Sequence, residues 1–401
     1  MQGIRENIRA FNQLRDPERL AIKYEKMRTN EYVFLRGSCH LFYDLLAKNA
    51  LPSNAPSGWI CGDLHLENFG SYKGSNRLTY FDINDFDESI LAPVTWDIVR
   101  FLTSIFAAKD TLEAGRSKVI ALCEAFLAAY TQALAGGKAY WVERDTAQGL
   151  IHALLADLRD RNRGDHLDKF TELSKKRRTI RCDGERALPV AAKARKAVEK
   201  WVQSYADTQK DGGFFDVLDV ARRIAGVGSL GAERYIVLIK GKGSSDSNYL
   251  LDIKASPQSS LSKHVQIQQP SWNSDAQRIV ATQTRMQAVP MAFLEVLNAK
   301  HQSYVLRGLQ ASEDRVSLDG DGVDFSDIQS VVAQMGRIVA WSQLRSSGQQ
   351  GAASTDRLVE FGERGKSWRN EIIAAAEQCA TQNHEAWKQY AAAYDAGQFK
   401  Q

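Results

Sequence analysis

The stretch Cys61-Gly-Asp-Leu-His-Leu-Glu-Asn-Phe-Gly70 decides how this chain is interpreted. It lies between two short runs with β-strand composition, SGWIC and RLTYFDI, and the turn-rich segment GSYKGSN separates the runs. Acids and amides gather here next to apolar strands, where buried acids are costly unless they bind a metal or pair. The simpler alternative is a polar turn with capping acids. The polar members of this region are Asp63, Glu67, Asn68, Asp82, Asn84 and Asp85.

Asp63 and Asn68 are five residues apart, which is the D-x-x-x-x-N spacing of kinase catalytic loops. Phosphoryl transfer from ATP needs a carboxylate that orients the acceptor hydroxyl and oxygen ligands that hold magnesium on the phosphates. Asp85, in Asp85-Phe-Asp at a strand end, stands where kinases have the aspartate of Asp-Phe-Gly. Asp97, in TWDIVRF, is open to two interpretations: a helix N-cap, or a support for the Asp63 loop.

A second motif, G-x-G-x-x-G, is formed by Gly226, Gly228 and Gly231. Dinucleotide-binding folds and kinases both use this pattern. In a dinucleotide-binding fold the glycines open a helix, but here the β-rich run ERYIVLI follows them. We therefore expect a strand-turn-strand hairpin of the kind that covers ATP phosphates in kinases.

Lys254, in the strand-like run YLLDIKA, follows this hairpin and resembles the lysine of the kinase V-A-I-K strand. Kinases pair that lysine with a helix glutamate, yet no glutamate occurs between Ala255 and Leu294. A helix is predicted to begin at Ser274, with a capping-box pattern. Gln283 on its apolar face is a candidate for the positional role of the glutamate; the alternative is a partly exposed glutamine.

The remaining periodicity predicts an α+β fold. Helical patterns cover residues 4–50, the stretch from Pro93 to Tyr205, and the chain from Phe325 onward, while strand-like runs concentrate between Phe214 and Gln310. We expect a helical catalytic lobe in residues 1–213, a small antiparallel β-rich nucleotide-binding lobe in 214–312, and helices completing the first lobe in 313–401.

The motifs FLRG (34–37), GDLHLENFG, NDFDE and GVGSLG resemble those of a bacterial family of unknown function, itself similar to aminoglycoside phosphotransferases and protein kinases. The resemblance implies a two-lobed kinase-like fold. It also implies that Asp63 orients the acceptor, that Asn68 and Asp85 bind Mg²⁺, and that Lys254 contacts phosphate. Asp82 is an alternative to Asp85 because the length of the hairpin between the strands is uncertain.

The order of the motifs differs from that of an ordinary kinase, in which the glycine loop and the lysine come first. A circular permutation explains this order, and permutation costs little where the chain ends lie close together at the surface. We therefore expect a permuted kinase-like fold in which a helix over Asp327–Ser346 leads from the nucleotide lobe back to the helical lobe.

The expected activity is ATP- and Mg²⁺-dependent transfer to a small-molecule or protein hydroxyl. Three alternatives remain open: transfer of AMP by the same site, a catalytically degenerate nucleotide-binding scaffold, and a metal-dependent phosphoesterase. The phosphoesterase would use Asp63, His65, Asn68 and Asp85 as ligands, but the other histidines are isolated in the sequence.

Composition limits the kinds of binding partner and the cellular compartment that we expect. The 401 residues carry a formal charge of only +4, which gives no general case for nucleic-acid or membrane binding. Five cysteines are scattered without a CxxC pair, as in a reducing compartment. No stretch is expected to reach the eighteen or more apolar residues of a membrane span, and the N-terminus has no apolar core of a signal peptide. A cytoplasmic protein is expected.

Overall fold

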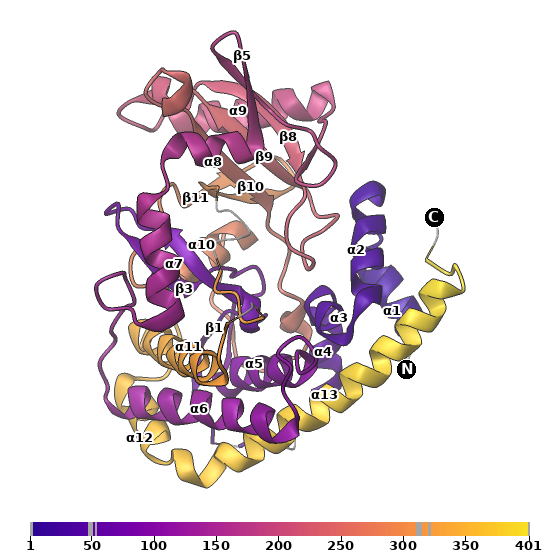
Figure 1. Cartoon of the computed structure of the whole chain (residues 1–401), viewed down its shortest axis with the longest axis vertical. Helices are drawn as coiled ribbons and strands as arrows, with labels where there is room; N and C mark the ends of the chain where they lie inside the picture. Colours follow the sequence, from indigo (N-terminus) through magenta and orange to yellow (C-terminus); the bar gives the residue numbers. More distant parts are fainter. Residues whose placement is uncertain (1–2, 47–50, 53, 310–314, 320–321, 400–401) are drawn as a thin grey trace.

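Strands β7 to β12 form one antiparallel sheet. In Figure 1 this sheet lies at the top together with α8 and α9, and most of the other helices lie below it. The computed structural model describes residues 3–46, 51–52, 54–309, 315–319 and 322–399. Its mixed helices and small antiparallel sheets confirm the α+β class. Residues 47–50, the end of the expected strand region at Gln310, and the expected boundary at 312–313 lie outside the described residues.

The large sheet has the strand order β11-β12-β10-β9-β8-β7, and all neighbours are antiparallel. The glycine motif connects β8 to β9, which confirms the predicted hairpin. Helix α10 begins as predicted, because the Ser274 hydroxyl accepts a hydrogen bond from the Gln277 N–H at 3.2 Å. The bounds are β7 Ala187–Leu188, β8 Val217–Arg223, β9 Arg234–Ile239, β10 Tyr249–Ala255, α10 Asp275–Met286, β11 Glu295–Asn298 and β12 Ser303–Gly308.

A segment that we had assigned to the helical lobe lies beside this sheet. Helix α9 (Ala192–Ala206) buries Val198 and Val202 against it, and β7 pairs with β8. Preceding these are α8 (Arg163–Phe170) and the hairpin of β5 (Thr171–Ser174) and β6 (Arg177–Ile180). The expectation of continuous helix to Tyr205 is wrong here. The hairpin is dominated by charged residues, so it lacks the apolar alternation that marks a strand.

Two small antiparallel pairs carry the GDLHLENFG region. Strand β1 (Ser57–Ile60) pairs with β4 (Ile90–Pro93), and β2 (Phe69–Lys73) pairs with β3 (Thr79–Ile83). The segment GSYKGSN is therefore only partly a turn, since its first half belongs to β2. A short 3₁₀ turn, η2 (Leu66–Asn68), ends the first loop, and the NDFDE loop connects β3 to β4. The pairing brings both loops to one end of these strands.

The helical part is built on α5 (Thr95–Ala107), whose residues are all buried. Helix α6 (Arg116–Ala135) packs closely on α11 (Phe325–Arg345): a Cβ at Gly336 would lie 2.4 Å from the Phe126 carbonyl oxygen. The predicted C-terminal helices are confirmed as α11, α12 (Thr355–Glu363) and α13 (Gly365–Asp395), and α7 spans Gly149–Asp160. Among the described residues, α6 alone is long and apolar enough to cross a membrane, which the sequence analysis had not recognised. Half of that stretch is buried inside the protein, as in an ordinary core helix.

The N-terminal helices lie against the last helix (Figure 1). Arg5 donates a hydrogen bond to the side chain of Gln398 at 3.1 Å, and Arg9 donates to its carbonyl oxygen at 3.2 Å. These helices are α1 (Ile4–Asn12), α2 (Pro17–Thr29), α3 (Glu31–Gly37) and α4 (Cys39–Leu45). The first and last helices of the chain are therefore neighbours.

Candidate functional site

The loop after β1 is fixed by a buried carboxylate. Asp97 of α5 accepts hydrogen bonds from the N–H groups of Cys61 and Gly62 at 2.8 and 2.9 Å. Burial raises the pKa of Asp97 to about 6, although the two N–H groups act in the opposite direction. Val94, not Asp97, is the N-cap of α5. Of the two interpretations left open for Asp97, support of the loop is therefore confirmed.

Gly62 must be glycine for two independent reasons. Its φ of +83° is strained for side-chain-bearing residues, and a Cβ would lie 2.3 Å from the carbonyl oxygen of Glu88. This close approach joins the loop after β1 to the loop after β3. The two acidic segments are consequently held together by backbone contact as well as by side chains.

Asp63 lies at the tip of the first loop and is oriented by an arginine. Arg100 of α5, which is fully buried, donates to Asp63 Oδ1 from Nη2 at 2.6 Å and from Nε at 3.1 Å. The other oxygen, Oδ2, faces the glycine loop: a Cβ at Gly228 would lie 3.9 Å from it. One oxygen therefore fixes the orientation of the carboxylate, and the other points toward the space in front of the loop.

Asn68 connects the two acidic loops. Its Nδ2 donates to the carbonyl oxygens of Asp63 and Asp85 at 3.1 and 3.2 Å, and its Oδ1 accepts from the Asp85 N–H at 2.8 Å. This network requires the nitrogen and the oxygen of the amide to be placed as they are. A carbonyl oxygen has a second lone pair, so Oδ1 keeps one position for a metal ion.

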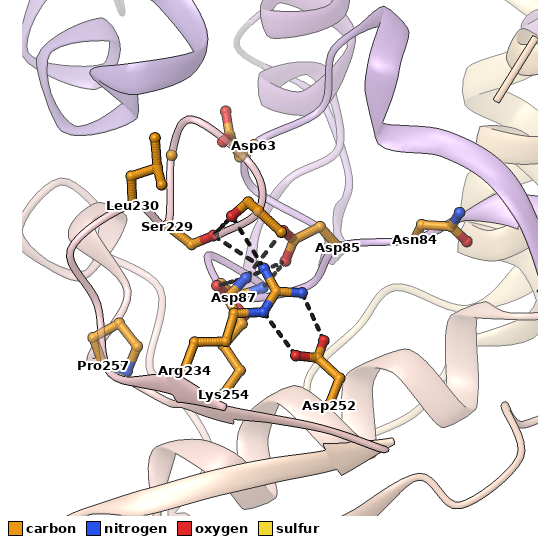
Figure 2. Close-up of polar contacts among 12 residues, drawn as sticks. Asp63, Asn84, Asp85, Asp87, Ser229, Leu230, Arg234, Asp252, Lys254 and Pro257 are labelled. Carbon is orange, nitrogen blue, oxygen red and sulfur yellow. Dashed lines mark hydrogen bonds and ion pairs between the residues drawn. The ribbon is translucent and has the colours of Figure 1, made fainter. Parts of the chain in front are cut away.

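Lys254 on β10 reaches the second loop and lies between two carboxylates (Figure 2). Its ammonium lies 3.2 Å from Asp85 Oδ2 and also forms an ion pair with Asp87. Burial by itself would raise the pKa of Asp85, but the cations Lys254, Arg307 and Arg234 outweigh it and lower the pKa to about 2. Burial and the neighbouring Asp85 raise the pKa of Asp87 above its ordinary value.

The glycine loop covers this space from the other side. Gly226 and Gly231 have φ of +67° and +83°, the left-handed region that glycine favours. Two basic side chains of the N-terminal segment hold the loop in place. Arg15 donates to the carbonyl oxygens of Gly228 and Leu230 at 2.6 and 2.7 Å, and the fully buried Lys23 donates to Gly228 at 3.0 Å.

These elements line one pocket of about 480 Å³. The structure brings together the sequence-predicted residues Asp63, Asn68, Asp85, Lys254, Gly226, Gly228 and Gly231. A larger cavity of about 750 Å³ lies between α6 and α11, and it holds none of the residues that we predicted for the site. We take the smaller pocket as the candidate site and refer to it as the central pocket.

Two predicted site residues lie outside the central pocket. Asp82 is buried and accepts from the N–H groups of Ile83 and Ala288, at 2.8 and 3.1 Å, and it forms an ion pair with Arg345 at 3.3 Å. It is therefore not the alternative metal ligand. The strand β3 continues through Ile83, so Asp82 points from the strand into the protein while Asp85 lies beyond its end.

Gln283 is the second correction. Its Nε2 donates to Gln287 Oε1 at 3.1 Å, and Gln287 in turn donates to the Ile83 carbonyl oxygen at 2.8 Å. This face of α10 packs toward β3, so Gln283 is not the partner of Lys254. Helix α10 contacts the acidic loop through Arg278 instead, which donates to the carbonyl oxygens of Asp87 and Ser89. Asp87 is a second carboxylate that pairs with Lys254, in addition to Asp85.

Arg100, Asp87 and a group of arginines on the sheet were not predicted from the sequence. Asp87 had a visible signal, because it stands at the glycine position of Asp-Phe-Gly. Arg100 had none, since its partner lies 37 positions away. The arginines Arg223, Arg234 and Arg307 surround Asp252, which lies on β10 two residues before Lys254.

The donor atoms of the pocket suit magnesium. Among the residues that the structure describes, no three His, Cys, Asp or Glu side chains form a group that could enclose a metal ion. Magnesium does not need such a group, because it usually binds one or two carboxylates, several waters and the phosphates of a substrate. Asp85, Asp87 and the Asn68 amide oxygen fit that description.

Comparisons with known proteins give a family and no nearer relative. A search of curated proteins and a search of solved structures each found no match. One family model matches residues 15–393, which is most of the chain and includes every residue assigned above to the pocket's two acidic loops, glycine motif and lysine. The chain belongs to the bacterial family described as "Uncharacterized protein conserved in bacteria (DUF2252)".

Proposed function

We propose that this protein is an ATP- and Mg²⁺-dependent phosphotransferase with a circularly permuted kinase-like fold, acting on a hydroxyl acceptor. One observation carries the proposal. Lys254 follows the glycine hairpin and pairs with Asp85, 169 positions earlier in the chain, and Asn68 joins Asp85 to the Asp63 loop. Phosphoryl transfer needs these groups together, and nothing in their sequence order brings them together.

The arrangement of the elements supports the permutation. The glycine hairpin, the lysine strand and α10 precede β11 and β12, and α11 then returns to the helical part, as expected for the helix over Asp327–Ser346. Helices α1 and α13 are neighbours, so joining the ends and opening the chain elsewhere requires little rearrangement. The motif order is therefore compatible with one kinase-like site.

Each residue has a definite task in this proposal. Lys254 and the N–H groups of the glycine loop bind phosphate oxygens, while Asp85, Asp87 and Asn68 hold the magnesium ion, which neutralises phosphate charge. Asp63, held by Arg100, accepts a hydrogen bond from the acceptor hydroxyl and receives its proton as the oxygen attacks phosphorus. Before ligand binds, the Lys254 ammonium occupies the space between Asp85 and Asp87 and keeps the two carboxylates apart.

Two of the alternatives, the phosphoesterase and the degenerate scaffold, are weaker and can be separated from the proposal by experiment. A phosphoesterase would need a closed set of metal ligands, of which His65 would be one. His65 is buried and neutral, because burial lowers its pKa, and its Nδ1 has no hydrogen-bond partner. A degenerate scaffold would bind nucleotide without turnover. The missing helix glutamate favoured that reading, but Asp87 provides a substitute carboxylate next to Lys254.

The test is ATP binding by calorimetry with Mg²⁺ and with EDTA, combined with turnover. We expect Mg²⁺ to strengthen ATP binding and Asp85→Ala to remove that gain. Asp63→Ala should reduce turnover at least about a hundredfold with little change in ATP affinity, whereas Lys254→Ala should weaken both. Equal ATP affinity with EDTA and in Asp85→Ala would contradict the proposal. If Asp63→Ala abolished ATP binding while Lys254→Ala changed nothing, a metal-first phosphoesterase would be the better account.

A further inference from the structure

The side of the central pocket that the large sheet forms is cationic, whereas a binding slot for the base of ATP would need apolar side chains. Arg223, Arg234 and Arg307 come from β8, β9 and β12, and all three line the pocket. They surround Asp252, which is fully buried behind them, at distances of 2.7, 2.6 and 3.2 Å. Asp252 shares a sheet face with Lys254 because successive side chains of a strand alternate between faces.

The positive charge on this side of the pocket is not balanced by Asp252 alone. Three guanidiniums share one carboxylate, so the arginine cluster carries an excess of positive charge in a buried setting. Including Lys254 with Asp85 and Asp87, four cations face three carboxylates before a magnesium ion is added. Buried cations are stabilised by anions with matching oxygens, and guanidinium groups bind phosphate in bidentate fashion. This arrangement favours the binding of a polyanion.

The cluster lies on the leaving-group side of the reaction. Asp63 and Asp252 are on opposite sides of the Asp85–Lys254 pair in Figure 2. If Asp63 orients the acceptor, the bond that breaks points away from Asp63. The part of the donor beyond the reacting phosphorus therefore meets Arg223, Arg234 and Arg307.

The two largest apolar side chains of the pocket lie at the opposite end. Phe11 is the one Phe, Tyr or Trp among the described residues that line this pocket, and Leu14 lies near it. Both are among six large apolar side chains that the described chain leaves exposed. They belong to the Asp63 end: Arg15 lies over the Phe11 ring and donates to Gly228, whose Cβ position is 3.9 Å from Asp63. The Phe11 ring also stacks on His40, with ring centroids 3.8 Å apart, so a base would meet the part of Phe11 that His40 leaves uncovered.

We infer that ATP binds with its terminal phosphates under the arginine cluster and its base toward Phe11 and Leu14, so that the group transferred is AMP. This inference rests on the proposed function and specifies what that site transfers. The acceptor hydroxyl oxygen forms a bond to the α-phosphorus, and the bridging bond from that phosphorus to the β-phosphate oxygen breaks. Pyrophosphate leaves with the electron pair, and the hydroxyl proton passes to Asp63. Phe11 and Leu14 give the base an apolar surface, and the three guanidiniums stabilise the pyrophosphate as its charge develops.

The first test needs no acceptor. Purified full-length protein is incubated with Mg²⁺ and ATP, and the products of slow hydrolysis are separated by ion exchange. AMP and pyrophosphate are expected, and both should disappear in Asp85→Asn. ADP and inorganic phosphate as products would overturn the inference while leaving the phosphotransferase proposal intact.

The second test is competition by inorganic pyrophosphate against ATP, measured by calorimetry with Mg²⁺, and it decides the question even if hydrolysis is too slow to detect. Pyrophosphate should displace ATP, and Arg307→Gln should weaken pyrophosphate binding at least about tenfold, with partial recovery in Arg307→Lys. Arg307 is the suitable position because Asp252 keeps Arg223 and Arg234 in that variant; thermal melting checks the fold. Arg195→Gln, which removes an ion-paired arginine of the same lobe outside the pocket, should change affinity less than twofold.

Outcomes separate the two proposals. If ATP binds with Mg²⁺ but pyrophosphate neither competes nor responds to Arg307→Gln, the arginine cluster is a structural network and the nucleotide lies the other way round. If neither ATP nor pyrophosphate binds the wild-type protein, the proposed function itself fails.

Discussion

Replacing Lys254 by methionine removes the cation that separates Asp85 from Asp87 and keeps much of the apolar stem of the side chain. Breaking a buried ion pair costs about 3–5 kcal/mol because an uncompensated charge remains. Lys254 is 5% exposed and Asp87 24%, but the Asp85 side chain is 47% exposed and partly solvated. We therefore expect Lys254→Met to lower the free energy of unfolding by about 2–3 kcal/mol without divalent ions.

Magnesium provides a sharper readout than stability alone. Without the ammonium, two adjacent carboxylates repel each other and attract a divalent cation more strongly. If Mg²⁺ binds the variant with a Kd of about 1 mM, 10 mM Mg²⁺ should restore about 1.4 kcal/mol. Chemical denaturation with and without 10 mM MgCl₂ measures both effects. The gain from Mg²⁺ should be larger in Lys254→Met than in wild type and absent in Lys254→Met/Asp85→Asn.

Lys240→Met is the matched control. Lys240 terminates β9 and pairs with Asp216 at 3.0 Å, but both side chains are about half exposed. Exposed pairs contribute about 0–1 kcal/mol, so this variant should remain within that range and show no added response to Mg²⁺. Our assignment of Lys254 would be untenable if its replacement cost no more than that of Lys240 and brought no gain in the response to Mg²⁺.

Three further predictions concern the acidic loops. Asp97→Ala leaves the buried N–H groups of Cys61 and Gly62 without an acceptor. We expect the free energy of unfolding in urea to fall by about 2–4 kcal/mol, and turnover to fall more than ATP affinity. A fall below about 1 kcal/mol would contradict this. The pKa of Asp97 is raised to about 6 from 3.8, so the contribution of Asp97 to stability is greatest below pH 3.8 and is lost as the pH rises through 6. Relative to Asp97→Asn, the wild type should therefore lose up to about 3 kcal/mol of unfolding free energy between pH 4 and 7. Parallel pH profiles of the two proteins would refute the shift. Gly62→Ala should cost more than about 2 kcal/mol, because φ is +83° and Cβ meets the Glu88 carbonyl oxygen. Gly213→Ala, whose Cβ would meet only the Asp211 side chain at 3.8 Å, should change unfolding by less than about 0.5 kcal/mol.

Local patterns predicted those parts of the fold that local chemistry decides. The Ser274 cap, the glycine hairpin and the strand carrying Lys254 depend on turn residues and alternation within a few positions, and all three are present in the structure. The β5–β6 hairpin was missed because half of its ten residues are charged and only two, Leu173 and Ile180, are apolar. It forms in contact with the sheet, where Arg178 pairs with Asp168 and Asp246, and the local pattern carries no sign of that contact.

The site residues divide in the same way, into those that local motifs predict and those that depend on packing between distant elements. Asp63, Asn68 and Asp85 follow from loop motifs, but the choice between Asp82 and Asp85 depends on where β3 ends, and strand ends are not resolved by composition. Gln283 has the spacing of a core-facing residue, and only the packing of α10 on β3 shows that it faces away from Lys254. The position of Asp252 could have been predicted from the sequence. Side chains alternate along a strand, so Asp252 lies on the same face as Lys254, and a buried acid with cationic partners could have been expected there.

The most direct test of the account is a crystal structure with Mn²⁺ and a non-hydrolysable ATP analogue, in which Mn²⁺ replaces Mg²⁺ and is located by anomalous scattering. We predict one manganese ion coordinated by Asp85, with a phosphate oxygen completing its coordination and Lys254 moved from between the two carboxylates onto phosphate. Manganese bound away from Asp85, or an analogue bound outside the pocket formed by Asp63, Lys254 and the glycine loop, would contradict it.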